Sequence, residues 1–338
     1  MLSTWTKEPG ARVAGSHGLD ASKVQAPCIV RRPEGGFRLF YTAVGPERPF
    51  PECQGYLLSA VSDDGVNFEK EPGIRLCPDQ SIPHVTRRIL APSIHPMADG
   101  QWRMYFESRA TAKESVVIAS AVSDNQLDWE FEPGIRLQLP NNRLAGPRFL
   151  PLENGTGRLF CCSHPKVDGF TIEGIISAVT SNGLDFEIEH QPHWISGTTA
   201  FDSSGVTAGE VIPPKENGQP WHMIFSAWES PPADSEVPLH PAQNMDEEVI
   251  DFAAASIASD MSGYRSRILV TQSLDGKSWG DPTLCIEGEG YGGDGVDAVH
   301  AEDMSLIELE DGRYRMYYAA CDAKGEWCVT SAVSSATS

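Results

Sequence analysis

A histidine and two carboxylates lie close together near the end of the chain, in the segment His300-Ala301-Glu302-Asp303. Residues 300 and 302 are two apart, so their side chains share one face of an extended strand. A carboxylate beside a histidine fixes the tautomer of the imidazole and tunes its pKa, which is typical of an acid/base unit. We therefore expect proton transfer from His300, Glu302 and Asp303, together with Glu210, which opens an earlier apolar strand.

Basic residues recur at one position of an internal repeat. Lys23, Arg88 and Arg143 each lie three residues ahead of an Ala-Pro or Gly-Pro pair that begins an apolar strand. Guanidinium groups bind the oxygens of carboxylate, sulfate and phosphate groups in pairs. The pattern therefore predicts a site for an anionic group of a small substrate. The alternative is that both these basic residues and the acids above form salt bridges that hold the repeats together.

Further candidate substrate-binding residues follow from their positions in the same repeats: Arg109, His164, Trp228 and Asp297. Three of them end a strand, and Asp297 lies in a glycine-rich loop before His300. Trp228 is suited to stacking on a sugar ring, or to packing beneath a loop. A divalent cation held by His300 and nearby carboxylates is an alternative, but we expect no metal and no cofactor.

The repeat has a period of roughly 55 to 65 residues, the scale of a propeller blade. Each copy begins with a short apolar strand and continues through a glycine-containing hairpin into an aromatic strand. A third strand carries the sequence Ser-Ala-Val, which is found at 59–61, 120–122, 177–179 and 331–333. Four antiparallel strands in each of five copies predict an all-β fold, a five-bladed β-propeller.

The first residues of the chain match a segment that elsewhere follows the Ser-Ala-Val strand. Trp5–Val13 (WTKEPGARV) resembles Phe68–Leu76 (FEKEPGIRL) and Trp129–Leu137 (WEFEPGIRL), whereas no such segment follows residues 331–333. We expect the N-terminal segment to form the outermost strand of the last blade and to close the ring. The chain is then a single domain, residues 1–338, with blades at about 22–77, 88–138, 143–196, 206–287, and 300–338 together with 1–14.

Topology indicates which end of the ring carries the site. The innermost strands begin at the face that also carries the long connections, whereas the tight glycine turns lie on the opposite face. Long loops on a rigid scaffold often bind ligands. The longest connection, residues 228–265, is expected to be either a lid over the channel or a dimer contact.

Composition excludes several classes of partner. The formal net charge of −21 argues against binding to nucleic acid or to an anionic membrane, because both require a basic surface. The sequence has neither an apolar stretch long enough to cross a membrane nor the pattern of a signal peptide. The eight cysteines show no Cys-x-x-Cys spacing, which favours free thiols in a reduced, cytoplasmic protein.

The strand pattern Ala-Pro-x-Ile at 26–29 and 91–94, and the turn Ser-Asp-Asp-Gly-x-x-Phe at 62–68, resemble the five-bladed propeller glycoside hydrolases of families 43, 32, 62, 68 and 130. This resemblance implies carboxylates around the channel mouth, acting as general acid and as base or nucleophile. In the family 43 pattern these acids occupy the positions of Ala26, Ser93 and Ala145. The segment Glu302–Leu306 is similar to the Glu-Cys-Pro-Asp-Leu motif of family 32, in which the Glu is the acid.

Three hypotheses follow. The first is an enzyme that performs acid/base chemistry (hydrolysis, elimination, isomerisation or cyclisation) on a small anionic or polyhydroxylated molecule in the central pocket. The second is a glycoside hydrolase whose catalytic carboxylates have moved to other blades. The third is a carbohydrate-binding propeller without catalytic activity.

Overall fold

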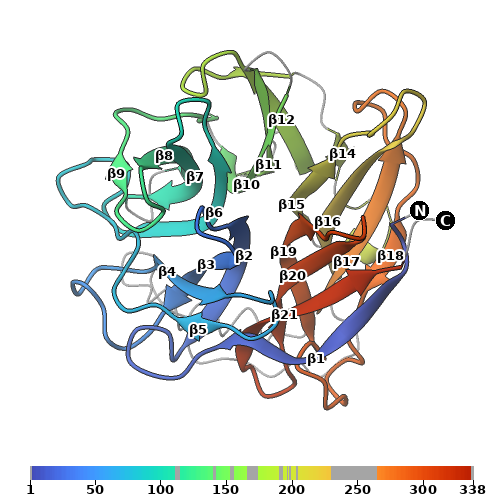
Figure 1. Cartoon of the computed structure of the whole chain (residues 1–338), viewed down its shortest axis with the longest axis horizontal. Coiled ribbons are helices and arrows are strands. Elements are labelled where there is room, and N and C mark those ends of the chain that lie inside the picture. Colours follow the sequence, from blue (N-terminus) through green and yellow to red (C-terminus); the bar gives the residue numbers. More distant parts are fainter. Residues whose placement is uncertain are drawn as a thin grey trace.

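The computed structural model describes residues 2–110, 115–139, 142–152, 156–165, 174–189, 193–195, 197, 199–202, 205–229 and 265–335. It contains five antiparallel sheets arranged as blades around a central axis (Figure 1). The five-bladed β-propeller predicted from the repeats is confirmed. No helix in the described ranges is long and apolar enough to cross a membrane.

From the axis outward, blade one consists of β2 (Lys23–Arg31), β3 (Phe37–Val44), β4 (Tyr56–Ser62) and β5 (Glu69–Lys70). Blade two consists of β6 (Arg88–Pro96), β7 (Trp102–Arg109), β8 (Val117–Ser123) and β9 (Glu130–Phe131). Blade three consists of β10 (Asn142–Pro151), β11 (Gly157–Pro165), β12 (Gly174–Thr180) and β13 (Glu187–Ile188), with β14 (Trp194–Ile195) also paired to β12. Blade four, which follows the 3-10 helix η2 (Ala200–Asp202), consists of β15 (Gly205–Ile212), β16 (Trp221–Glu229), β17 (Arg265–Ser273) and β18 (Thr283–Ile286). Blade five consists of β19 (His300–Glu308), β20 (Tyr314–Cys321), β21 (Trp327–Ser334) and β1 (Trp5–Ala14).

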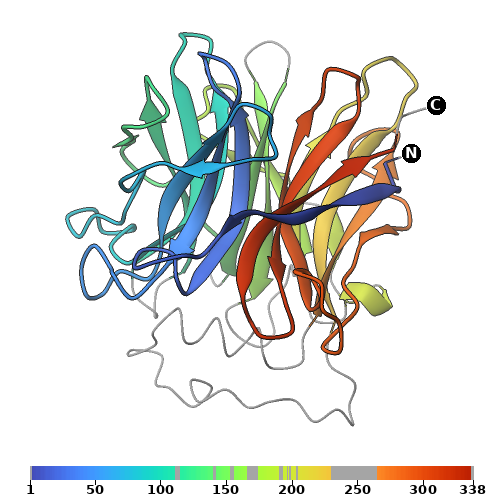
Figure 2. The same ribbon diagram turned by 60° about the horizontal axis from the view of Figure 1, so that its bottom comes forward.

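The N-terminal strand closes the ring, as predicted. Strand β1 pairs antiparallel with β21, with Trp5 opposite Ser334 and Ala14 opposite Cys328. Figure 2 shows β1 running along the outside of blade five. The register shifts between Glu8 and Val13, where Gly10 adopts a left-handed conformation (φ 80°) that glycine tolerates best.

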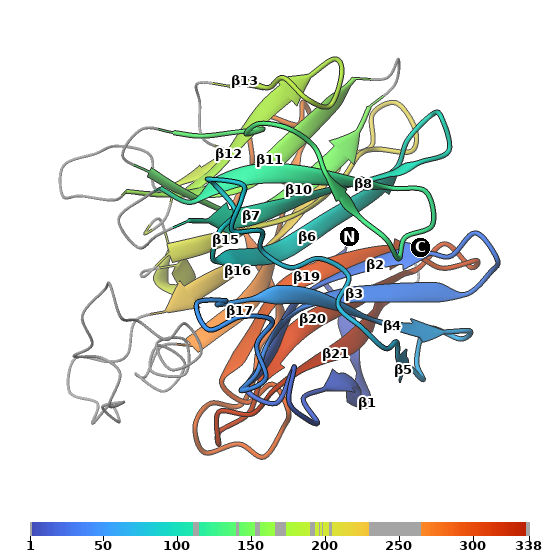
Figure 3. The ribbon, with the colours of Figure 1, turned by 90° about the vertical axis from the view of Figure 1, so that its left-hand side faces the viewer.

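Apolar residues fill the space between blades. The clusters combine side chains from neighbouring sheets: Phe40 and Leu57 of blade one, for example, pack with Met104 and Phe106 of blade two. In the side view of Figure 3 the innermost strands β2, β6 and β19 run close together through the middle of the molecule. Most strands are therefore buried on both faces, which explains their nearly continuous apolar sequences.

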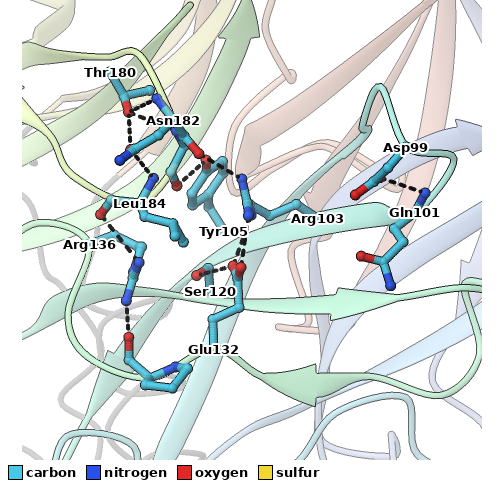
Figure 4. Close-up of polar contacts among 12 residues, drawn as sticks. Asp99, Gln101, Arg103, Tyr105, Ser120, Glu132, Arg136, Thr180, Asn182 and Leu184 are labelled. Carbon is cyan, nitrogen blue, oxygen red and sulfur yellow. Dashed lines mark hydrogen bonds and ion pairs between the residues drawn. The ribbon is translucent and has the colours of Figure 1, made fainter. Parts of the chain in front are cut away.

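A repeated polar contact, which we call the Arg–Glu–Ser clip, ties the outer strands of a blade together. In blade two, Ser120 Oγ donates to Glu132 Oε2 (2.7 Å), and Arg103 Nη2 lies 2.8 Å from Glu132 Oε1 (Figure 4). Arg103 also donates to the backbone carbonyl of Asn182 in blade three. Equivalent clips join Arg38, Glu71 and Ser59 in blade one, Arg158, Glu189 and Ser177 in blade three, and Arg315, Glu8 and Ser331 in blade five.

Blade four has no clip, because His222 stands at the arginine position and contacts Gln272 instead. His222 and Gln272 line a cavity of about 520 Å³, whose wall also includes Tyr314 of blade five and Leu2. In the other blades the clip arginine reaches the turn between the third and fourth strands of the next blade. Blade five has no such turn, because its fourth strand comes from the N-terminus.

Candidate functional site

A bulge in every innermost strand turns one residue toward the axis. The pairing with the second strand shifts register at equivalent places in all five blades, for example between Gln25 and Cys28 and between Glu302 and Ser305. Three side-chain-bearing residues at the start of this bulge adopt a left-handed conformation: Ala26 (φ 47°), Ala91 (φ 51°) and Asp303 (φ 49°). Asp303 is therefore placed at the same structural position as Ala26, in a different blade.

Backbone amides of these bulges bond to the neighbouring blade in a regular way. The Ala91 amide donates to Thr42 Oγ1 (3.0 Å), and the Asp303 amide donates to Ser226 Oγ (2.9 Å). In each case the acceptor is on the second strand of the preceding blade. These bonds hold the bulge and so fix the direction of the side chain that it carries.

Asp303 lies half-buried among groups from three other blades. Burial raises the pKa of its carboxyl group, and the nearby charges of Arg148 and Lys23 and the Thr207 hydroxyl oppose that rise. A raised pKa favours the protonated form of the carboxyl group, and the protonated form is the one that a general acid requires.

Glu107 is a second buried carboxylate that the sequence did not single out. Its Oε1 lies 2.7 Å from Arg88 Nη2, and it accepts the amide of Gly146, the bulge residue of blade three. Burial raises the pKa of Glu107, the charge of Arg88 lowers it, and the negative charge of Asp303 raises it further. The charge of Asp303 in blade five thus reaches Glu107 in blade two.

Glu107 could have been identified by aligning the five blades, because it is the one large charged residue at its position. Its position on the second strand is occupied in the other blades by small residues: Thr42, Cys162, Ser226 and Ala319. Thr42 and Ser226 accept the bulge amide with a hydroxyl group. Glu107 accepts the equivalent amide with a carboxylate. A neutral hydroxyl group would accept this amide equally well, so the hydrogen bond alone does not explain the charge.

Arg148 forms an ion pair with Glu210, and its charge also acts on Asp303. Arg148 Nε lies 3.7 Å from Glu210 Oε1, and Arg148 is only 3% exposed. Burial raises the pKa of the Glu210 carboxyl group, whereas Arg148, the Ser305 hydroxyl and the Leu306 amide lower it. The structure thus brings Glu210 and Asp303, both predicted site residues, to one arginine.

His300 is enclosed by aromatic rings and has no exposed surface. It stacks on Trp327 (ring centroids 5.5 Å apart, 13° between planes), and Trp228 lies 5.4 Å away on a tilted plane. Its Nδ1 is 3.1 Å from Ser266 Oγ. These contacts enclose His300 in a packed environment, and Trp228, which is half-buried, packs against it.

The basic residues predicted for the mouth occupy two environments. Lys23 is buried with its ammonium group 4.1 Å from the centre of the Trp327 ring, a cation–π contact, and its charge acts on Asp303. Arg88 pairs with Glu107, and the positive charge of Arg143 lowers the pKa of Arg88. Arg143 is half-buried, and within the described ranges no ion pair to a carboxylate is found for it.

The remaining predicted residues lie apart from this group or at its edge. Glu302 is buried beside Asp303, and Arg109 pairs with Arg88 in the β6–β7 ladder. The backbone of His164 pairs with Arg143, and its side chain is outside the described part of the structure. Asp297 accepts a hydrogen bond from Tyr318 Oη of β20 (2.9 Å) and lies 2.6 Å from Lys7 Nζ of β1, which places it against blade five.

A serine, a histidine and a glutamate also meet in blade three, as part of its clip. Trp279 Nε1 donates to His193 Nδ1 (3.1 Å), so the proton of this histidine is on Nε2, which faces Ser177 Oγ at 2.7 Å. Ser177 in turn donates to Glu189. The histidine therefore cannot accept the serine proton, and the group links blades instead of activating a nucleophile.

No cluster of three metal-binding side chains is found among the described residues. All eight cysteines are free. Most of the predicted lid or dimer contact, residues 230–264, lies outside the described residues.

Solved structures with the same fold include several glycoside hydrolases. A candidate glycoside hydrolase from Parabacteroides distasonis superposes with a TM-score of 0.68 at 13% identity, covering 99% of this chain and 97% of the other. A member of the GH130 family of mannoside phosphorylases, which contains hydrolases targeting β-1,2 mannosidic linkages in Candida mannan, has a TM-score of 0.66 at 12% identity, covering 98% and 94%. A thermostable family-43 glycoside hydrolase has a TM-score of 0.60 at 14% identity, covering 96% and 91%.

No model of a protein family matches the sequence, and no curated protein matches it. The likeness to solved structures extends over nearly the whole chain, so the resemblance in fold that the sequence suggested is confirmed. The chain has the five-bladed propeller fold found in these glycoside hydrolases.

Proposed function

We propose that this protein is a glycosidase-like, carbohydrate-active enzyme whose catalytic carboxylates are Asp303 and Glu107. The observation that carries the proposal is the pair itself: the buried Glu107 of blade two and the half-buried Asp303 of blade five, whose charge acts on Glu107. Two such groups supply the acid and the base that hydrolysis of a glycosidic bond requires.

The electrostatics of the pair support one carboxyl group acting as the acid and the other as the base. Because like charges repel in a medium of low dielectric constant, the negative charge of Asp303 favours the protonated form of Glu107. The protonated member can donate to the leaving oxygen of a glycoside, and the ionised member can activate water or attack the sugar. Both carboxylates have nearby cations, Arg88 for Glu107 and Arg148 with Lys23 for Asp303, which limits the cost of burying the charges.

The excess of basic groups at the rim supports a substrate with an anionic substituent. Arg143 lies within electrostatic reach of Arg88, whose acidic partner is Glu107. A carboxylate, sulfate or phosphate group on the substrate would relieve the repulsion between these two arginines.

A panel of 4-nitrophenyl glycosides tests the proposal: arabinofuranoside, xyloside, mannoside and glucuronide, each with and without inorganic phosphate. We expect release of nitrophenol from at least one compound, with the glucuronide favoured over its neutral counterparts. Asp303→Asn and Glu107→Gln should each lower kcat at least about 100-fold. Asp99→Asn, in the hairpin on the opposite face, is the matched control and should leave kcat unchanged.

Two results would count against the proposal. Full activity in Asp303→Asn would show that this carboxylate has no catalytic role. Sugar binding measured by calorimetry, without any product from any compound, would instead favour a carbohydrate-binding propeller.

A further inference from the structure

Arg148 crosses the axis of the propeller and contacts three other blades. Its Nη1 donates to the carbonyl of Pro92 in blade two (3.3 Å), and its Nε and Nη2 donate to the carbonyl of Met304 in blade five (3.3 and 3.2 Å). Its Nε also lies 3.7 Å from Glu210 of blade four. With a further bond to Pro147, all three nitrogens of the guanidinium group are engaged within the protein.

These contacts exclude direct substrate binding by Arg148. The side chain is almost wholly buried, and its donors point to backbone carbonyls that cannot be displaced without opening the blades. Any effect of Arg148 on a reaction at the mouth must therefore act through the groups that it touches.

Arg148 also interrupts a ring of hydrogen-bond acceptors around the axis. The residue two positions after the start of the bulge accepts an amide of the following blade: Ser305 Oγ from Ile29 (3.2 Å), Ser93 Oγ from Phe149 (2.9 Å), and Cys28 Sγ from Ile94 (3.4 Å). Glu210 likewise accepts from Leu306. A guanidinium group has no acceptor atom. Arg148 therefore cannot accept a backbone amide of blade four in the way that the other blades accept theirs. A serine would continue the ring, which indicates that a positive charge is required at this position.

We propose that Arg148 is a positioning residue of the candidate active site, whose charge sets the protonation of the Asp303 and Glu210 carboxylates that share it. The inference rests on the proposed function in which Asp303 transfers a proton. One guanidinium group next to two half-buried carboxylates cannot neutralise both, so proton uptake by one of them strengthens the interaction of Arg148 with the other.

The neighbouring charged and titratable groups are part of this balance. Asp303 also faces Lys23 from β2 and the Thr207 hydroxyl from β15, and its charge acts on Glu107 from β7. Glu210 faces Ser305 from β19, and the thiol of Cys28 senses both Arg148 and Glu210. Arg148 is the one cation in this set that acts on both Asp303 and Glu210.

The test is a titration of the free protein, with 13C-labelled Asp and Glu carboxyl groups followed by NMR and assigned with Asp303→Asn and Glu210→Gln. Arg148→Met should raise the titration midpoints of Asp303 and Glu210 by about 1 to 3 pH units. Arg148→Lys keeps the charge but loses the carbonyl bonds, so it should lower the Tm while the midpoints stay within about one unit of wild type.

A merely structural arginine predicts a different pattern, in which both variants lower the Tm and neither moves the midpoints. That result would overturn the proposal. Arg103→Met, which removes a clip arginine far from the mouth, is the matched control: it should lower the Tm and leave both midpoints unchanged.

If Arg148→Met does not fold, Glu210→Gln carries the test. This variant releases Arg148 from one of its two carboxylates, so the midpoint of Asp303 should fall, and an unchanged midpoint would refute the coupling. Because the titration uses no substrate, it can succeed even if the glycoside panel shows no turnover. The two proposals can thus fail independently.

Discussion

Asp303 in blade five and Ala26 in blade one occupy equivalent positions, because each begins the bulge of an innermost strand in a left-handed conformation (φ 49° and 47°). Ala26 is where the family 43 pattern would place a carboxylate. In a ring of similar blades, an acid moved to the adjacent blade still points to the axis. Blade five thus carries a carboxylate, Asp303, at the structural position that Ala26 holds in blade one.

The left-handed conformation of the bulge predicts a stabilising substitution. Alanine at φ 51° is strained, because its Cβ approaches the following carbonyl oxygen, and glycine is not. We expect Ala91→Gly to raise the free energy of unfolding by up to about 1 kcal/mol, since the greater flexibility of glycine offsets part of the gain. Urea unfolding measures this difference. Ala121→Gly, in the interior of β8, should destabilise the protein, and equal losses in both variants would contradict the strain.

The Arg–Glu–Ser clips predict a clear cost for a single removed charge. In Glu132→Gln the guanidinium group of Arg103, only 13% exposed at its side chain, keeps its charge without a carboxylate. We expect a loss of about 3 kcal/mol in the free energy of unfolding.

The exposed pair Lys215–Glu308 offers the matched control. Glu308→Gln should cost less than about 1 kcal/mol, because water solvates the remaining charge. Similar losses in Glu132→Gln and Glu308→Gln would show that the clip contributes no more than a surface ion pair.

His95 predicts a decline in stability at acidic pH. Its ring stacks on Tyr105 and on Phe149, which also contact each other. Burial, aided by the charge of Arg103, lowers the pKa of His95 from 6.5 to about 3. The folded state therefore disfavours the protonated ring, whereas the unfolded chain takes up the proton below about pH 6.5. The contribution of His95 is complete above that pH and falls between pH 6.5 and 3, by at most about 1.4 kcal/mol per pH unit.

The variant His95→Phe keeps the stack and cannot be protonated. Its unfolding midpoint should fall less than that of the wild type between pH 7 and 4, as measured by urea titration at each pH. His17→Gln, which removes an exposed histidine, should follow the wild type. If His95→Phe also followed the wild type, the acid sensitivity would belong to other groups.

Closure of the ring by β1 predicts complementation between two pieces of the chain. Removal of residues 1–14 leaves β21 with an unpaired edge and Arg315 without Glu8. We expect the shortened protein to aggregate or to lose Tm, and a synthetic peptide of residues 1–14 to restore it. A scrambled peptide of the same composition should have no effect. An unchanged Tm after the deletion would mean that this strand does not hold the ring together.

The sequence by itself determined the fold and the closure of the ring. Repeated Ser-Ala-Val strands, glycine hairpins and the displaced copy Trp5–Val13 are local patterns, and each is repeated often enough to be read without coordinates. It also showed that Ala26 stands where a carboxylate is expected, and it directed attention to Asp303 and Glu210, which the structure places around Arg148.

Only the tertiary structure decided which charged groups meet. His300 and Asp303 are three residues apart, yet the bulge turns Asp303 toward the axis while His300 packs between two indole rings. Glu107 and Asp303 are nearly 200 positions apart in the sequence, and the charge of Asp303 reaches Glu107 because five blades converge on one axis. Burial depends on this convergence, and burial raises the pKa values of both carboxylates, so no reading of local spacing could have found the pair.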